Sequence, residues 1–237
     1  MSLVIIFSFG FQYYTLQHLP VVDCLPFKKG NNIIEKRQVP ADAIPDSFAI
    51  RFIYSKGGKE FEFSQLELPA DLNTYKFISR KDKLIRKGNA EAAIKGFDLK
   101  GQSGMDSTLQ VLQQPIAVLL IGEDLKHPSV SWTAGFSSVF NTSKQKNIPV
   151  YIITGQAGNA IQITGGTAYA SVPVFTCDNV TIRTAARSNP TLYIIQQGTI
   201  TGKWSGSDLG KAEKVLTELP DMPPPAPVQQ QPTDSIQ

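Results

Sequence analysis

The stretch that decides the fold is Arg187-Ser188-Asn189-Pro190-Thr191-Leu192-Tyr193-Ile194-Ile195-Gln196-Gln197-Gly198-Thr199-Ile200. Its apolar run after the proline is rich in strand formers and ends at a Gln-Gly pair. A second strand pattern follows the glycine and runs to Trp204. Two strand patterns on either side of a glycine turn predict a β-hairpin that begins directly after Pro190.

A hairpin introduced in this way resembles the last hairpin of thioredoxin-like folds. The resemblance implies that the Asn189-Pro190 bond is cis and lies beside a redox site. It also implies that the helix facing Pro190 begins with a Cys-x-x-Cys pair. This chain has no Cys-x-x-Cys, since its two cysteines are Cys24 and Cys177. The sequence therefore indicates a redox scaffold without its usual thiols.

The bulk composition indicates a folded protein with no electrostatic preference for a partner. The chain has 237 residues, 41% of them hydrophobic, which is enough for one large domain or a domain with extensions. Its net charge is only +3, and the basic residues are scattered among acidic and apolar ones. This balance does not favour a nucleic-acid partner. Two distant cysteines form no disulfide framework, and they can pair or stay free.

The N-terminus is apolar and carries no Asp, Glu, Lys or Arg before Asp23. It lacks the basic start and the small-x-small site of a secretory signal. Its apolar run from Leu3 to Phe11 is shorter than a complete membrane span, and Tyr13, Tyr14 and His18 are typical of a membrane interface. We interpret residues 1–18 as the end of a transmembrane helix. The alternative is a buried helix or strand of the folded domain.

Residues 19–94 are predicted to be an extended lead-in followed by a hairpin-rich extension. Four prolines between Leu19 and Pro45 favour an irregular strap over the domain surface. Apolar and polar residues alternate through 47–68 around Gly57-Gly58, a strong hairpin pattern. Two further short strands are expected over residues 75–79 and 83–88.

Residues 95–219 alternate between strand and helix patterns, which predicts an α/β domain with a mixed sheet flanked by helices. Strands are expected over 97–99, 116–121, 149–154, 172–175 and 191–204, the last as the hairpin. Helices are expected over 106–113, 129–146, 159–163, 180–186 and 207–219. In the second of these helices, Trp132, Phe136, Val139 and Phe140 are spaced to share one buried face.

Residues 220–237 form a Pro/Gln-rich tail with Pro223-Pro224-Pro225 and Gln229-Gln230-Gln231. Such a composition cannot bury a core and predicts a disordered or polyproline segment.

Two segments in the right order resemble DoxX-type membrane proteins with a large soluble C-terminal part. The first is Tyr14-x-Leu16-x-His18-Leu19-Pro20-x-x-Asp23-x-x-Pro26-Phe27-Lys28-x-Gly30-x-Asn32-Ile33, and the second runs from Arg187 to Trp204. The resemblance implies a thioredoxin-like domain tethered to a bundle of transmembrane helices in a redox setting. Where relatives commonly have an aromatic residue after the junction Asp, this chain has Cys24, so no inherited role attaches to that thiol.

The position of the missing thiols corresponds to residues 124–131, between the first buried strand and its helix. Thiol exchange needs a thiolate stabilised at a helix N-terminus, and this stretch has no sulfur. His127 and Ser129 lie near the expected cysteine positions. A serine near a histidine with no third orienting group is a weak sign of a nucleophile, and surface loop residues are the simpler interpretation.

The residues before the predicted cis bond form a second candidate site. In active relatives the backbone before this proline pairs with an extended substrate. Pro190, Asn189 and Ser188 are therefore candidates for an edge of the domain that binds an extended peptide. The alternative is that the cis bond only shapes the sheet.

Cys177 is the candidate catalytic thiol, although most unpaired cysteines are small buried residues. The sequence predicts no metal site and no cofactor, because it has two histidines and no phosphate-loop motif.

Two functional hypotheses follow. The first is a membrane-tethered binding or structural module that lacks the Cys-x-x-Cys pair. The second is a thiol oxidoreductase or peroxidase-like enzyme that uses Cys177, with Cys24 as its partner. Expected partners are the membrane, other membrane redox proteins or an extended peptide. The cytoplasmic side of the membrane is favoured by the basic residues Lys28, Lys29, Lys36 and Arg37. The analogy with tethered thioredoxin-like modules favours the periplasm, and we expect the soluble part to lie there.

Overall fold

The computed structural model describes residues 11, 12, 14, 15 and 17–223. Its described residues form two compact units. The core unit contains the described residues up to Arg37 together with those from Ile94 onward, and the sheet unit contains Gln38–Ala93. The expected boundaries at residues 18, 94 and 219 stay a prediction. Among the described residues, no helix is both long and apolar enough to cross a bilayer.

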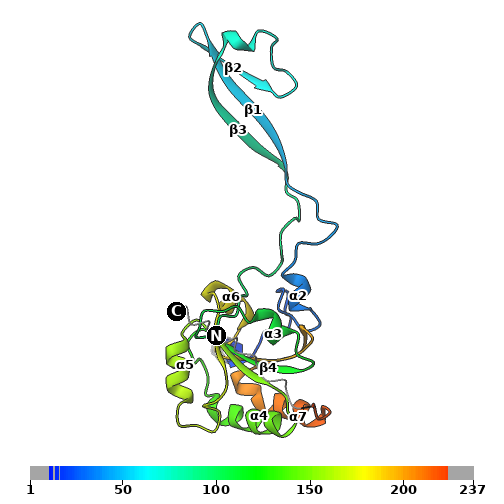
Figure 1. Cartoon of the computed structure of the whole chain (residues 1–237), viewed down its shortest axis with the longest axis vertical. Helices are drawn as coiled ribbons and strands as arrows, with labels where there is room; N and C mark the ends of the chain where they lie inside the picture. Colours follow the sequence, from blue (N-terminus) through cyan, green and yellow to red (C-terminus); the bar gives the residue numbers. More distant parts are fainter. Residues whose placement is uncertain (1–10, 13, 16, 224–237) are drawn as a thin grey trace, which may run out of the picture. The chain divides into compact units, whose positions relative to one another are not determined.

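The core unit is built on a mixed five-stranded sheet in the order β6-β5-β4-β7-β8, of which Figure 1 labels β4. Its strands are β4 (Ala117–Gly122), β5 (Val150–Thr154), β6 (Val174–Thr176), β7 (Thr191–Gln196) and β8 (Thr199–Ser205). β4, β5 and β6 are parallel, whereas β7 is antiparallel to β4 and to β8. This order, with a closing hairpin and a last helix, is the thioredoxin-like arrangement that the sequence predicts.

Helices cover both faces of this sheet. They are α2 (Ile33–Lys36), α3 (Thr108–Leu112), α4 (Thr133–Gln145), α5 (Ala157–Thr164), α6 (Asn179–Ala185) and α7 (Leu209–Glu218). Residues of α4, α5 and α7 pack with Val118 and Leu120 on one face. Residues of α2, α3 and α6 pack with Leu119 and Ile121 on the other. All six residues of β4 are buried, as its continuous apolar run predicts.

Two expectations for the core unit were wrong in detail, and one helix was not predicted. Residues 97–99 form no strand, because the Leu99 amide donates to the Thr108 hydroxyl at 2.8 Å instead of to a neighbouring strand. The helix expected from Ser129 begins only at Thr133, although Trp132, Phe136 and Val139 are buried as predicted. The short helix α2 was not expected, and it is capped by Asn32, whose side chain accepts from the amides of Ile34 and Glu35.

The lead-in packs against the core unit through a buried ion pair. The Lys203 ammonium of β8 lies 2.7 Å from the Asp23 carboxylate and 3.2 Å from the Phe27 carbonyl oxygen, and its side chain is only 6% exposed. Phe27 and Ile33 are also buried. The segment therefore contributes to the core as well as crossing the surface.

The described N-terminal residues contact the start of α7. His18 Nδ1 lies 2.8 Å from an oxygen of Asp208, and the rings of Tyr14 and His18 are in contact. Together with residues of β8 they line a pocket of about 190 Å³. Most of the predicted transmembrane segment, residues 1–10, 13 and 16, lies outside the described residues.

The C-terminal segment is described only as far as Pro223. The Met222 amide donates to the Lys146 carbonyl at 2.8 Å, so the first residues after α7 pack against the end of α4. The rest of the predicted tail lies outside the described residues.

The sheet unit is a three-stranded antiparallel sheet in the order β2-β1-β3. Its strands are β1 (Ser47–Lys56), β2 (Lys59–Ser64) and β3 (Lys76–Arg86), with the short 3-10 helix η1 (Leu72–Thr74) before β3. The Gly57-Gly58 hairpin is confirmed, and both glycines have positive φ. The two short strands expected over 75–79 and 83–88 are one strand, since β3 pairs along nearly the whole length of β1.

Candidate functional site

One edge of the five-stranded sheet gathers several loops. The carboxyl ends of β4, β5 and β6 lie side by side there, with Gly122 paired to Thr154 and Thr154 to Thr176. Because β7 is antiparallel to β4, it begins at the same edge, directly after Pro190. Ligands of open α/β sheets bind at this edge. It is also where the sequence places the missing thiols.

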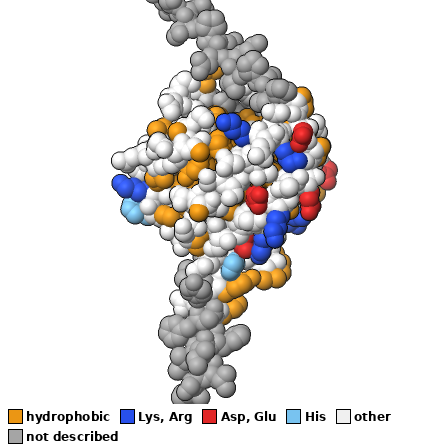
Figure 2. All heavy atoms as spheres, turned by 90° about the horizontal axis from the view of Figure 1, so that it is seen from below, with side chains coloured by type: hydrophobic (Ala, Val, Ile, Leu, Met, Phe, Trp, Pro, Cys, Tyr) orange, Lys and Arg blue, Asp and Glu red, His pale blue; other side chains and the backbone are white. Residues whose placement is uncertain are grey.

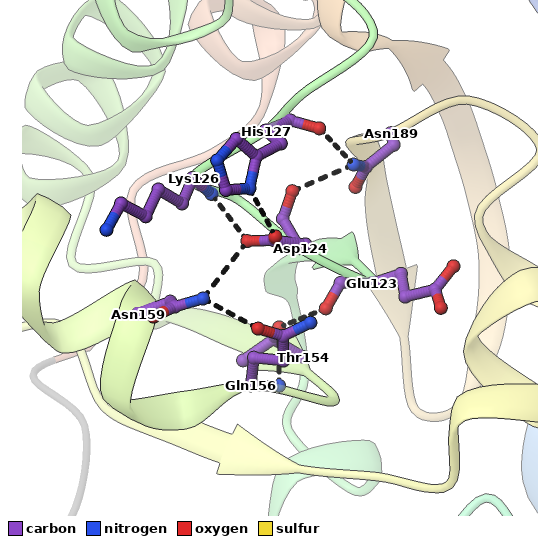
Figure 3. Close-up of polar contacts among 8 residues, drawn as sticks. All are labelled: Glu123, Asp124, Lys126, His127, Thr154, Gln156, Asn159 and Asn189. Atoms are coloured by element: carbon purple, nitrogen blue, oxygen red, sulfur yellow. Dashed lines mark hydrogen bonds and ion pairs between the residues drawn. The ribbon is translucent and has the colours of Figure 1, made fainter.

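Asp124 is the centre of the site loop, which we define as residues 123–132. Its carboxylate accepts hydrogen bonds from the Lys126 amide at 2.9 Å and from the Asn159 side-chain amide at 3.4 Å (Figure 3). His127 Nδ1 lies 2.7 Å from the other carboxylate oxygen. The hydrogen bond from His127 holds the pKa of Asp124 below its usual value against the opposing effect of burial. The loop thus carries a prearranged Asp-His pair.

The Asp-His pair presents its imidazole to solvent. The His127 side chain is 76% exposed, whereas that of Asp124 is 19% exposed. With Nδ1 directed at the carboxylate, the second ring nitrogen is the group left to meet a ligand or partner. This arrangement suits hydrogen bonding to a bound group.

Three hydrogen bonds connect the site loop to the segment before Pro190. The Asn189 side-chain amide donates to the carbonyl oxygens of Asp124 at 2.8 Å and of His127 at 3.3 Å. The Ser129 amide donates to the Asn189 carbonyl oxygen at 2.8 Å. The Asn189-Pro190 bond is cis, as predicted. The structure therefore brings together four candidates from two segments about 60 residues apart. They are His127 and Ser129 in the site loop, and Asn189 and Pro190 before β7.

The polar groups before Pro190 are largely used within the fold. The Ser188 side chain is buried, and its hydroxyl donates to the Pro190 carbonyl oxygen at 2.7 Å. The Asn189 carbonyl oxygen, which an incoming strand needs as an acceptor, already accepts from Ser129. This geometry does not favour pairing of an extended peptide at Ser188 and Asn189.

Cys177 follows β6 and lies in the core cluster that includes Phe97, Ile153 and Ile182. Its backbone amide donates to the Thr154 carbonyl oxygen at 3.2 Å, and its Sγ lies 3.4 Å from the Gly96 carbonyl oxygen. Burial raises the pKa of this thiol to about 11. The exposed Cys24 lies in the lead-in, and both thiols are free. With this raised pKa, the Cys177 thiol is protonated at neutral pH and is a poor nucleophile.

Sequence reasoning missed several residues at the same edge. Arg183 of α6 pairs through two hydrogen bonds with Glu123, and the Nε bond measures 2.8 Å. The Thr154 hydroxyl donates to the Glu123 carbonyl oxygen at 3.1 Å, and Asn159 donates to Gln156 at 2.6 Å (Figure 3). The Asp-x-x-His spacing of Asp124 and His127 was a usable local signal, but nothing in the sequence signalled the pairing of Glu123 with Arg183.

Metal ligation gives no further site in the part of the chain that the structure describes. No three His, Cys, Asp or Glu side chains of the described residues come together as a metal ion requires. On the face drawn in Figure 2, Lys and Arg side chains are interspersed with Asp and Glu side chains. The hydrogen-bonded edge around Asp124 is the candidate site.

A family model matches residues 48–87, which make up most of the sheet unit, and it is described as a domain of unknown function (DUF8463). No curated protein matches the chain. The DoxX resemblance is not supported by these comparisons.

Several solved structures resemble about half of the chain. A SCO1/SenC family lipoprotein from Bacillus anthracis is 13% identical with a TM-score of 0.38, covering 53% of this chain and 94% of its own. Yeast Sco1 is 14% identical with a TM-score of 0.37, covering 53% and 95%. An exposed lipoprotein thioredoxin from Streptococcus pneumoniae is 18% identical with a TM-score of 0.36, covering 52% and 99%. The fold assignment itself follows from the strand order and helix placement.

Proposed function

We propose that this chain is a thioredoxin-like binding or structural module that works without thiol exchange, and that it is part of a membrane-tethered, redox-associated protein of DoxX type. The observation that carries the proposal is the site loop. An Asp124-His127 pair, hydrogen-bonded to Asn189, occupies the position where thiol enzymes of this fold carry cysteines.

The site loop is suited to binding because its polar groups are already ordered. A preformed loop loses little conformational entropy when a partner binds. His127 offers an exposed ring nitrogen, and the Asp124 carboxylate fixes the ring's orientation. The proposed binding determinants are therefore His127 and the adjoining surface of the loop, including Ser129.

The thiol enzyme is the competing function, and the burial of Cys177 weighs against it. The test is the reaction of each thiol with a small disulfide reagent at pH 8, before and after denaturation, in the variants Cys24→Ser and Cys177→Ser. We expect Cys177 in the first variant to react only after unfolding, and Cys24 in the second to react in the native protein. Rapid native reaction of Cys177, together with turnover of a disulfide substrate such as insulin, would overturn the proposal.

Membrane tethering is tested separately by fractionating cells that produce the protein. We expect the protein in the membrane pellet, resistant to alkaline carbonate and released by detergent. Release by carbonate alone would contradict an integral anchor while leaving the thiol result unaffected, so the two parts of the proposal fail independently. The periplasmic side, which we also propose, is tested by protease protection in intact spheroplasts, where a cytoplasmic module would resist digestion.

A further inference from the structure

The sheet unit has almost no core of its own. Among residues 38–93, all of which the structure describes, Ile53 is the one buried hydrophobic side chain. Figure 1 shows its three strands as a single layer. A sheet of three strands becomes stable when a hydrophobic face is covered. The sheet therefore needs a second layer.

One face of this sheet is apolar and the other is mostly polar. Strand register places eight apolar side chains on the first face, which we call the apolar face: Phe48, Ile50, Phe52, Tyr54, Phe61, Phe63, Phe77 and Leu84. The opposite face carries Arg51, Glu60, Glu62, Lys81 and Lys83, together with Ala49 and the buried Ile53. Alternation of this kind is typical of an antiparallel sheet with one face buried against a partner and one face in water.

The apolar face is exposed over much of its area. Phe48 and Phe77 are each 52% exposed, Leu84 is 46% exposed and Phe61 is 38% exposed. Tyr75 packs against Phe61 and Phe63 and covers only the β2 side. Buried aromatic side chains contribute about 150–250 Å² each. The four exposed side chains and the partly exposed Ile50, Phe52, Tyr54 and Phe63 together therefore offer on the order of 500 Å² per copy.

We propose that the apolar face is a homodimer interface, on which a second copy of this chain packs face to face. Two such faces bury on the order of 1,000 Å² in total, which reaches the lower bound for a specific interface. A self-complementary surface of this kind generates a closed two-fold dimer. The two sheets then form a sandwich with a core about 10 Å thick.

The charges of the sheet unit fit a second copy better than a lipid surface. Arg80 and Asp82 lie on the apolar face and pair at 2.6 Å, so packing buries no net charge there. The unit has nine Lys and Arg against eight Asp and Glu residues. Peripheral binding to anionic lipid needs a strongly basic flank, which this balance lacks.

The test is the mass of the full chain in solution, measured by sedimentation equilibrium over a concentration series. We expect twice the 25.9 kDa of one chain. Leu84→Glu and Phe77→Glu place a charge on the apolar face and should weaken dimerisation at least tenfold. The matched control is Lys83→Glu, which introduces the same side chain next to Leu84 on the polar face and should leave the mass unchanged.

Because the substituted side chains are exposed, we expect the variants to remain folded, and circular dichroism checks this. A second readout needs no destabilising change: Phe52→Cys in a Cys24→Ser, Cys177→Ser background should cross-link to its copy with a bis-maleimide that spans the roughly 10 Å between packed sheets. Arg51→Cys should not. A monomer at every concentration would overturn the proposal. This holds if the apolar face is instead covered by the core unit, and also if it binds added vesicles of anionic lipid. A dimer that both Leu84→Glu and Phe77→Glu leave intact would also overturn the proposal.

Discussion

The two units of this chain use sheets in opposite ways. In the core unit all six residues of β4 are buried between two layers of helices. In the sheet unit the ten residues of β1 include one buried side chain, Ile53. Both sheets are rich in β-branched and aromatic residues. The difference shows that strand propensity builds a sheet, whereas its stability depends on what covers it.

The largest expected effect comes from removing a core side chain. Phe136 is fully buried and contacts the rings of Trp132 and Tyr169. We expect Phe136→Ala to lower the free energy of unfolding by about 3–5 kcal/mol. Leu66→Ala in the sheet unit, at a side chain 97% exposed, should change it by no more than about 0.5 kcal/mol. Urea denaturation measures both changes in the free energy of unfolding. Equal changes would contradict the difference in burial between the two units.

The next effect concerns two ion pairs, one buried in the core unit and one exposed in the sheet unit. Asp23→Ala leaves the Lys203 ammonium nearly buried without its carboxylate, and we expect a loss of about 3 kcal/mol. The double variant Asp23→Ala, Lys203→Met should recover most of it. Asp71→Ala removes the exposed partner of Lys56 and should cost less than about 1 kcal/mol. A small effect of Asp23→Ala alone would mean that the lead-in is not part of the core.

A smaller effect is expected at the site loop. Asn189→Ala removes two side-chain hydrogen bonds to the carbonyl oxygens of the loop, which costs about 1–2 kcal/mol. Amide hydrogen exchange over residues 124–129 should become faster, measured by mass spectrometry. Asn73→Ala, at an exposed position before β3, is the matched control and should change exchange nowhere in the core unit. Unchanged exchange in the loop would show that Asn189 does not order it.

The smallest effect is the acid dependence of the Asp-His pair. The pKa of Asp124 is lower in the folded than in the unfolded chain, chiefly through the hydrogen bond from His127. Its contribution is therefore complete above the unfolded value of about 3.9 and is lost as the pH falls through the lower folded value. Asp124→Asn should reduce stability at pH 6 by less than about 1 kcal/mol. The difference from the unmodified chain should vanish by about pH 2, as followed by thermal unfolding at each pH.

Much of the core unit could be predicted because its elements are signalled locally. Pro190 and Gly198 bound the hairpin strand β7, and the spacing of Phe136 and Val139 defines the buried face of α4. The failures occurred where a hydrogen bond to another segment replaced a local preference. Leu99 bonds to the Thr108 hydroxyl instead of joining a strand, and Ser129 bonds to Asn189 ahead of the later start of α4.

The candidate site was predicted in part. His127, Ser129, Asn189 and Pro190 are brought together as the resemblance to thioredoxin-like folds implied. The inward direction of Ser188 and the deep burial of Cys177 could not be predicted, because side-chain direction and burial depend on packing partners far away in the sequence.

The sequence by itself determined the residue types, the absence of Cys-x-x-Cys, the hairpin at Gly57-Gly58 and the run of strands and helices from Ala117 to Glu218. These features depend on composition and on patterns within a few residues. Only the tertiary structure decided that Asp124 meets Asn159 and Asn189, that Asp23 neutralises a buried lysine, and that the sheet unit lacks a core. Such outcomes depend on which distant segments the fold brings within hydrogen-bonding distance and on which surfaces it leaves in water.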